Sequence, residues 1–181
     1  MPKSPALPTR VLLVCAAIGV ATGILGGVAG YLSLAVSATV PVLYGLVLGS
    51  HVLPGVIAQA LLRRPGVAII THLLAALVSS AIAPAWALRY LGTALLIGAI
   101  QEGITAIGRY RSWAVWRFLV SAVIVGIILA VPIGLAADID KFQPWAYVVY
   151  LVMFVVGPVA WTYAGLATGD ALRKAGVAQQ R

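Results

Sequence analysis

Long apolar runs, each about the length of a membrane-spanning helix, alternate with short polar segments along the whole chain. A helix that crosses the hydrocarbon core of a bilayer needs about 20 mostly apolar residues. Six windows meet this requirement, at about 11–35, 39–62, 66–88, 90–108, 113–137 and 144–168. The connections between them are too short to form a soluble domain. The pattern therefore predicts an all-α integral membrane protein, with one six-transmembrane-helix bundle occupying residues 1–181.

Proline and glycine modify this picture in the last two windows. We expect the fifth helix to be broken at Pro132–Gly134, because proline lacks an amide donor and disrupts helical hydrogen bonding. We expect Gly169 to cap the end of the sixth helix, since glycine readily adopts the left-handed conformation found there.

Composition agrees with a lipid environment. The chain is 62% hydrophobic and only 9% charged, whereas soluble domains carry about 25% charged residues. The first apolar run continues past residue 30 and is longer than the apolar core of a signal peptide, which has about 7–15 residues. We therefore interpret it as a retained first span.

The basic residues predict the orientation of the bundle. Six spans place both termini on one side, together with Lys3, Arg10, Arg63, Arg64, Arg109, Arg111, Arg117, Arg173, Lys174 and Arg181. The other side holds only Arg89 and Lys141. Because cytoplasmic loops are enriched in Lys and Arg, we expect a multi-pass protein of the cell (plasma) membrane with both termini cytoplasmic. The net charge of +8 is divided among loops and forms no continuous face, which argues against a nucleic-acid partner.

The first window carries two columns of small residues. Gly19, Gly23 and Gly27 repeat every fourth residue, and Ala17 and Ala21 form an adjoining column. Small residues allow helices to approach closely in lipid. The columns indicate either packing within this subunit or a docking face for a partner membrane protein.

Aromatic residues gather at the outer ends of the predicted spans. Trp86 and Tyr90 flank the second outer loop, and Trp145, Tyr147 and Tyr150 follow the third. Membrane proteins place such residues at the level of the lipid headgroups. The alternative is that some of these rings turn inward and stack on a flat ligand.

Few polar side chains lie inside the spans. Glu102 stands out, because an acid at the centre of a spanning helix costs about 2.5–3.5 kcal/mol on insertion scales. It lies at about the depth of His72, and Gln101 is its neighbour. Three interpretations stay open: a buried ion pair of Glu102 with His72 or Arg109, a counter-charge for a cationic ligand, and a proton relay.

Other chemistry has little support in the sequence. Two histidines in separate helices, without further ligands at suitable spacing, predict no metal site. There is no nucleophile–base arrangement and no phosphate-binding glycine loop ahead of Lys-Ser/Thr. We therefore expect a protein that is not an enzyme and uses no cofactor, and any ATPase that powers it would be another chain.

Four short motifs resemble a known family. They are Arg-Pro-Gly-Val-Ala at 64–68, Leu-Leu-Ala-Ala-Leu-Val at 73–78, Gly-Ala-Ile-Gln at 98–101 and Arg-Tyr-Arg at 109–111. Together they resemble the substrate-binding (S) components of energy-coupling-factor (ECF) vitamin transporters. The nearest subgroup is the YkoE-like one, which is linked to thiamine or its hydroxymethylpyrimidine precursor.

The resemblance implies a membrane protein that binds a vitamin from the outer side. It also implies assembly with a transmembrane coupling subunit and two cytoplasmic ATPases, docked through the small residues of the first helix. We expect the outer aromatics to stack on the ligand and Glu102 or Gln101 to hold its amine or ring nitrogens. We also count His72 among the candidate substrate-binding residues. If Glu102 and His72 are instead a structural pair, the ligand lies higher, among the outer aromatics and Gln101.

Two alternatives remain. A self-contained proton- or cation-coupled carrier would use His72 and Glu102 as a relay. A ligand-free structural membrane subunit would use its polar residues only for stability or assembly.

Overall fold

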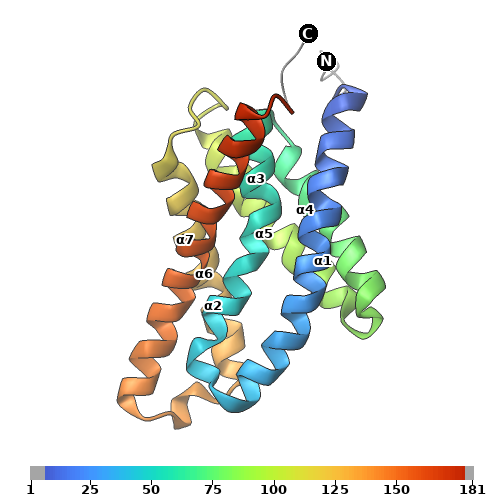
Figure 1. Ribbon diagram of the computed structural model, residues 1–181. Coiled ribbons are helices and arrows are strands. Elements are labelled where there is room, and N and C mark those ends of the chain that lie inside the picture. The colour runs from blue at the N-terminus through green and yellow to red at the C-terminus, as the bar shows by residue number, and fades with distance from the viewer. Residues whose placement is uncertain (1–6, 178–181) are drawn as a thin grey trace, which may run out of the picture.

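The computed structural model describes residues 7–177, which form a helical bundle without strands (Figure 1). The helices are α1 (Thr9–Thr39), α2 (Tyr44–Leu48), α3 (Leu53–Leu62), α4 (Val67–Ile82), α5 (Ala87–Ile107), α6 (Val115–Ala136) and α7 (Pro144–Lys174). Short 3-10 turns are η1 (Pro41–Leu43), η2 (Gly49–Val52), η3 (Pro84–Trp86) and η4 (Ile139–Lys141). Since η1, α2, η2 and α3 form one continuous apolar segment, Pro41–Leu62, the all-α six-helix bundle is confirmed.

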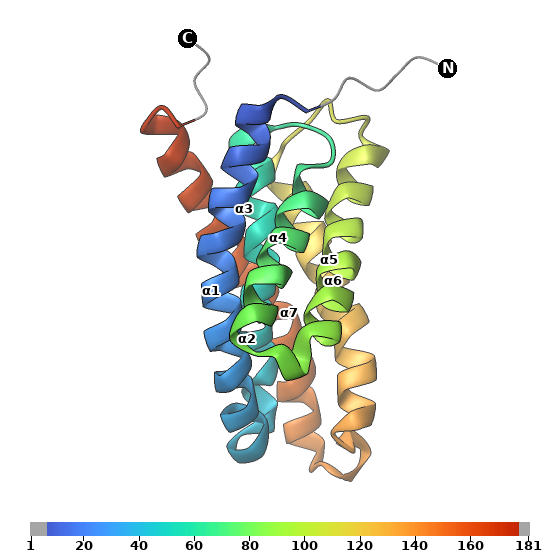
Figure 2. The same ribbon diagram turned by 90° about the vertical axis from the view of Figure 1, so that its right-hand side faces the viewer.

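The two ends of the bundle differ. The start of α1 and the end of α7 lie together, and the Arg10 guanidinium donates a hydrogen bond to the carbonyl of Val177 at 3.2 Å. The connections 63–66 and 108–114 lie at this same end (Figure 2), which we call the terminal end. The opposite, loop end holds the turns at 40–43 and 137–143. Eight of the ten basic residues expected on one side belong to the described chain and lie at the terminal end; Lys3 and Arg181 fall outside the described residues.

The α4–α5 hairpin is shorter than its neighbours. It turns at η3, before it reaches the loop end, while α1, α2, α6 and α7 continue past it (Figures 1 and 2). We predicted that the third helix extends to residue 88, but α4 ends at Ile82 because Ala83 precedes Pro84. A residue before proline is disfavoured in the α conformation, and Ala83 has φ −134° and ψ 77°.

The two other expectations for helix breaks are wrong. Helix α6 runs through Pro132 to Ala136, and α7 supports it there, since the Tyr150 hydroxyl donates to the Ala130 carbonyl at 3.0 Å. Packing against a neighbouring helix is one way in which membrane helices tolerate proline. Gly169 lies within α7 and is buried. A Cβ there would come within 2.7 Å of the Ala60 Cβ, so Gly169 permits close packing and does not cap the helix.

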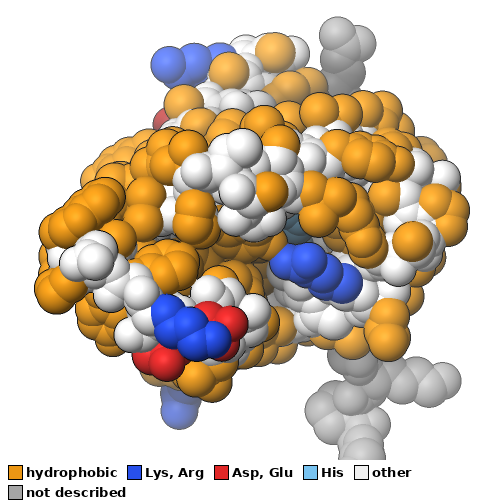
Figure 3. Space-filling model, turned by 90° about the horizontal axis from the view of Figure 1, so that it is seen from below, with side chains coloured by type: hydrophobic (Ala, Val, Ile, Leu, Met, Phe, Trp, Pro, Cys, Tyr) orange, Lys and Arg blue, Asp and Glu red, His pale blue; other side chains and the backbone are white. Residues whose placement is uncertain are grey.

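The glycine column of α1 packs inside the chain. A Cβ at Gly19 would lie 2.7 Å from the Leu74 Cβ, and one at Gly23 would lie 2.6 Å from the Ala75 carbonyl oxygen. A Cβ at Gly27 would meet Ile82. All three glycines therefore contact α4, which favours intramolecular packing over docking for this column. Many large hydrophobic side chains are exposed, among them Leu13, Leu88 and Ile107, as lipid contact requires. Figure 3 looks onto the loop end and shows hydrophobic side chains around it.

Candidate functional site

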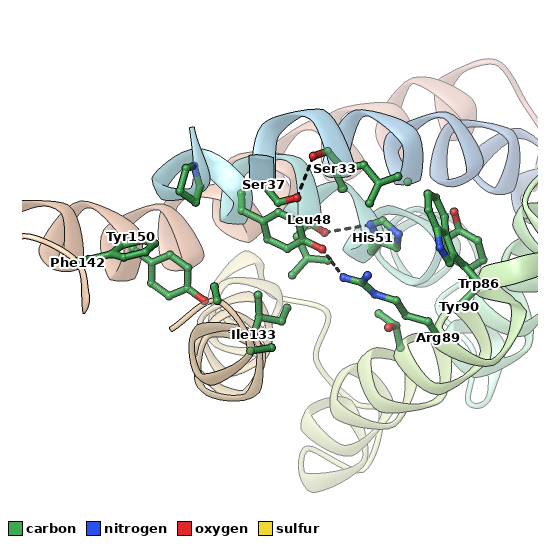
Figure 4. Close-up of a pocket in the computed structure, with 17 residues that line it drawn as sticks. Ser33, Ser37, Leu48, His51, Trp86, Arg89, Tyr90, Ile133, Phe142 and Tyr150 are labelled. Carbon is green, nitrogen blue, oxygen red and sulfur yellow. Dashed lines mark hydrogen bonds between the residues drawn. The ribbon is translucent and has the colours of Figure 1, made fainter. Parts of the chain in front are cut away.

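A cavity of about 590 Å³ lies at the loop end, in the space that the short α4–α5 hairpin leaves open (Figure 4). This volume is in the range of small-molecule sites. The cavity is lined by residues of α1, the η1–α2–η2 segment, α5, α6 and α7, namely Gly30, Ser33, Leu34, Ser37, Pro41, Tyr44, Leu48, His51, Trp86, Arg89, Tyr90, Thr93, Ile133, Ala136, Ala137, Phe142 and Tyr150. Aromatic rings and a few polar groups therefore surround it.

Three of the five aromatic residues that we expected at a ligand site line this cavity. They are Trp86, Tyr90 and Tyr150. Trp145 and Tyr147 do not line it, and they are 66% and 44% exposed. Helix α7 buries the face that carries Ala146, Tyr150 and Phe154, so Trp145 and Tyr147 lie on either side of that face and point toward the surroundings of the protein.

Arg89 is a lining residue that sequence reasoning used only for topology. It lies in the first turn of α5, and its guanidinium donates a hydrogen bond to the Tyr44 hydroxyl of α2 (Figure 4). No other Lys, Arg, Asp or Glu of residues 7–177 lines the cavity. Its position between Trp86 and Tyr90 in the sequence was the available signal. The cavity therefore offers a fixed positive charge beside aromatic faces.

His51 is one of the two histidines for which the sequence predicts no metal site, and it forms part of the cavity wall. Its Nδ1 lies 3.2 Å from the Leu48 carbonyl, and its ring stacks on Tyr90 with centroids 6.3 Å apart. His51, Tyr90 and Thr93 also line a second, much smaller cavity of about 30 Å³, which His72 borders from α4. His72 therefore borders the smaller cavity and does not line the main one.

Gln101 holds in place His72, which borders the smaller cavity. The Gln101 Oε1 lies 2.9 Å from the His72 Nε2, and the Gln101 Nε2 donates to the Val52 carbonyl at 3.1 Å. Gln59 donates to the Thr105 hydroxyl at 3.2 Å in the same buried network. Because these buried groups have partners, the network fixes α3, α4 and α5 against one another. Neither Gln101 nor His72 lines the main cavity.

Glu102 caps the start of α4 and pairs with no basic side chain of residues 7–177. Its carboxylate accepts hydrogen bonds from the backbone amides of Gly66 at 3.1 Å and Ala68 at 2.8 Å, and from the Tyr110 hydroxyl at 3.0 Å. Of the three interpretations that the sequence left open, the ion pair with His72 or Arg109 is therefore not formed. The first amides of a helix lack intrahelical partners, and the helix dipole favours an anion there.

The position of Glu102 also separates it from the cavity. It is 7% exposed, does not line the cavity, and bonds to the connections 63–66 and 108–114 at the terminal end. Burial and the Glu102 carboxylate raise the pKa of Tyr110, so the phenol stays protonated and keeps donating to the carboxylate. The geometry thus supports a structural role for Glu102 and no contact with a ligand in the cavity.

The alanine column of α1 faces a different space from the glycines. Ala17 and Ala21 are exposed and border an almost wholly apolar groove of about 470 Å³ near the terminal end. The groove is lined by α1, α3, α7 and the residues after it, through Arg10, Leu13, Val14, Ala17, Ile18, Ala21, Thr22, Ile57, Leu61, Thr168, Leu172 and Val177. Of the two small-residue columns, only the alanines are therefore available to a partner.

Comparison with known proteins agrees with this architecture. A solved structure described as "Crystal structure of an S-component of ECF transporter" matches with a TM-score of 0.84 and 15% identity, covering 96% of this chain and 89% of that chain. No curated protein matches the chain. A model of the family "ABC-type cobalt transport system, permease component" matches residues 10–128. The chain therefore belongs to this family of ABC-type permease components and has the fold of an ECF S component.

Proposed function

We propose that this chain is the substrate-binding subunit of an ECF-type ABC importer and captures a small, flat vitamin or vitamin precursor. The observation that carries the proposal is the cavity of about 590 Å³ lined by aromatic rings and Arg89. An apolar cavity with a few placed polar groups suits a ring-shaped ligand, which the rings contact and the polar groups orient. Family membership and the S-component fold support the same conclusion.

Among the ligands implied by the sequence resemblance, hydroxymethylpyrimidine suits the cavity better than thiamine. Thiamine carries a permanent positive charge on its thiazolium ring, and the charged side chain that lines the cavity is Arg89. Glu102, the acid that we expected to balance a cation, is engaged at the start of α4. A neutral pyrimidine with a hydroxyl group avoids the repulsion and offers Arg89 an acceptor.

The family description also names cobalt as a possible cargo. Within residues 7–177 no group of three or more His, Cys, Asp and Glu side chains is placed to hold a metal ion together. Stable metal sites in proteins use several such ligands. The described residues therefore favour an organic ligand over a bare metal ion.

The membrane orientation follows from the positive-inside rule as part of the same proposal. With the basic terminal end in the cytoplasm, the cavity at the loop end faces the outside and can receive ligand there. The apolar groove beside Ala17 and Ala21 then lies in the cytoplasmic half, and we propose that the transmembrane coupling subunit docks into it. ATP hydrolysis would take place in the two cytoplasmic ATPases.

Equilibrium binding of labelled hydroxymethylpyrimidine and thiamine to the purified chain tests the ligand. We expect saturable binding of hydroxymethylpyrimidine and weaker binding of thiamine. Tight thiamine binding would contradict the charge argument, and failure of both compounds to bind would exclude the proposed ligands.

Reconstitution tests the class of transporter. Liposomes that contain this chain alone should not accumulate the pyrimidine, whereas liposomes with the coupling subunit and ATPases should do so when ATP is present. Proton-driven uptake by the chain alone would instead support the self-contained carrier.

A further inference from the structure

The small cavity beside the main one is bordered by both histidines of the chain. It has a volume of about 30 Å³ and shares His51, Tyr90 and Thr93 with the main cavity. A space of this size accommodates one water molecule or one small polar group. We propose that it is a subsite for an uncharged amino group on the ligand's ring. The two N–H groups of this amino group would each donate a hydrogen bond to one of the two histidines. This inference rests on the proposed function, since the ring would lie in the main cavity.

The hydrogen bond of His51 determines which of its nitrogens is free. Its Nδ1 lies 3.2 Å from the Leu48 carbonyl oxygen. A carbonyl oxygen only accepts, so Nδ1 must carry the hydrogen. In the neutral ring the Nε2 then holds a lone pair, and no hydrogen bond within the described chain uses it. His51 therefore presents an acceptor at the boundary of the two cavities.

The tautomer of His72 follows from Gln101 by the same reasoning. The Gln101 side chain approaches the Val52 carbonyl at 3.1 Å, so its amide nitrogen must be on that side. The other atom, Oε1, accepts a hydrogen from the His72 Nε2 at 2.9 Å. The lone pair of neutral His72 is consequently on Nδ1.

The packing of His72 leaves its Nδ1 edge to the small cavity. The Nε2–Cδ2 edge faces Gly55 and Gly98, because a Cβ on Gly55 would lie 2.7 Å from the His72 Nε2 and one on Gly98 would lie 3.4 Å from its Cδ2. Neither glycine borders the small cavity, whereas His72 does. The opposite edge, which carries Nδ1, is therefore the one that an occupant of the cavity meets.

The remaining polar groups favour a neutral donor as the occupant. Tyr90 lines both cavities, and its buried hydroxyl has no hydrogen-bond partner among the described residues. No Asp or Glu borders the space, so a charged ammonium group would be buried without a counter-ion, at high cost. An aromatic amino group is uncharged, and its two N–H donors match the two imidazole acceptors.

Nuclear magnetic resonance of the full chain labelled with ¹⁵N-histidine tests the subsite directly. The chain has two histidines, so purification through a tag without histidine leaves signals from only these two rings. We expect unprotonated nitrogens at His51 Nε2 and His72 Nδ1. Both signals should move upfield when 4-amino-5-hydroxymethyl-2-methylpyrimidine is added, and much less with the analogue that carries hydrogen in place of the amino group.

Paired substitutions separate the role of each nitrogen from the need for a folded protein. His51→Gln keeps an acceptor near the Nε2 position, whereas His51→Asn keeps a group near Nδ1 and removes that acceptor. His72→Gln likewise retains the donor to Gln101 and removes the Nδ1 acceptor. We expect the wild type and His51→Gln to prefer the amino compound by about tenfold, and His51→Asn and His72→Gln to lose most of this preference.

The outcomes distinguish the subsite from the proposed function. Binding of both compounds with equal affinity, or the opposite tautomer at either ring, overturns the amino subsite while the main cavity stands as the ligand site. Failure of both compounds to bind overturns the proposed ligand, and the amino subsite falls with it.

Discussion

Glu102 is a buried acid whose partners within the described part of the chain are backbone amides and a tyrosine hydroxyl, not a cation. Its carboxylate accepts from Gly66, Ala68 and Tyr110. An acid deep in an apolar bundle is costly unless such donors surround it. This arrangement explains how the chain carries Glu102 without an ion pair, and it joins two connections at the terminal end.

We predict that Glu102→Ala destabilises the protein and leaves ligand affinity unchanged. The substitution leaves two helix-terminal amides and a tyrosine hydroxyl without their acceptor, so the expected loss is about 1–2 kcal/mol. Thermal unfolding in detergent measures the stability, and pyrimidine binding at low temperature measures the affinity. Tyr110→Phe, which removes one of the three bonds, should cause a smaller loss. A large fall in affinity with unchanged stability would return Glu102 to the ligand site.

Arg89 provides the corresponding prediction for the cavity. Arg89→Met keeps an unbranched, flexible side chain and removes the charge and the donors, so binding of hydroxymethylpyrimidine should weaken by about tenfold or more. Lys141→Met is the matched control, because Lys141 is the other basic residue at the loop end and pairs with Asp138 at 3.0 Å on the surface. Isothermal titration of both variants measures the difference. Equal affinities in the two variants would exclude Arg89 from ligand binding.

The sequence shows which polar side chains are buried in the bundle, but it does not show what they form hydrogen bonds with. His72, Gln101 and Glu102 are visible because polar side chains are rare inside apolar runs. Glu102 accepts hydrogen bonds from backbone amides that lack helical partners because α4 begins at Val67. The sequence alone does not show at which residue this helix begins. Arg89 was hidden for a different reason: a single arginine near a helix end is also what membrane topology requires.

Helix α1 uses its two columns of small residues for different contacts. The glycines meet α4, and Ala17 and Ala21 border the apolar groove. Both columns consist of small residues four positions apart, so the sequence does not distinguish them. They differ in what lies against them, which only the structure shows. Their functions can therefore be separated by substitution.

We predict opposite results for Ala21→Leu and Gly23→Leu. Ala21→Leu fills the groove, so the chain should remain stable and bind the pyrimidine but fail to co-purify with the coupling subunit. At Gly23 even a Cβ would lie 2.6 Å from the Ala75 carbonyl oxygen, so leucine should separate α1 from α4 and reduce stability or folded yield. Co-purification and size-exclusion chromatography measure the two effects. Normal assembly of Ala21→Leu would exclude the groove as the docking site.

The number of helices was predictable from the sequence, but the length of the α4–α5 hairpin was not. Apolar residues continue through 82–87, so hydropathy alone does not mark the turn at η3. The turn comes from the proline at residue 84 and its effect on Ala83. This local feature determines the site, because the space beyond the short hairpin becomes the main cavity and brings Trp86, Arg89 and Tyr90 to its edge.

At the scale of the whole molecule, the distribution of charge and the position of the cavity are linked. The basic connections lie at the terminal end, and the main cavity is lined by residues of the loop-end half of the bundle. If the positive-inside rule holds for this chain, the cavity receives ligand from outside the cell. The reverse orientation would open the cavity to the cytoplasm and would rule out capture for import.

Cysteine labelling in intact cells tests this orientation. The chain has one cysteine, Cys15, which is buried, so Cys15→Ala provides a background without reactive thiols. In that background we predict that Lys141→Cys, at the loop end, reacts with a membrane-impermeant maleimide. Arg111→Cys, at the terminal end, should react only after the membrane is permeabilised. The pyrimidine should bind to both variants, since neither residue lines the cavity, and labelling of Arg111→Cys in sealed cells would reverse the orientation and contradict import.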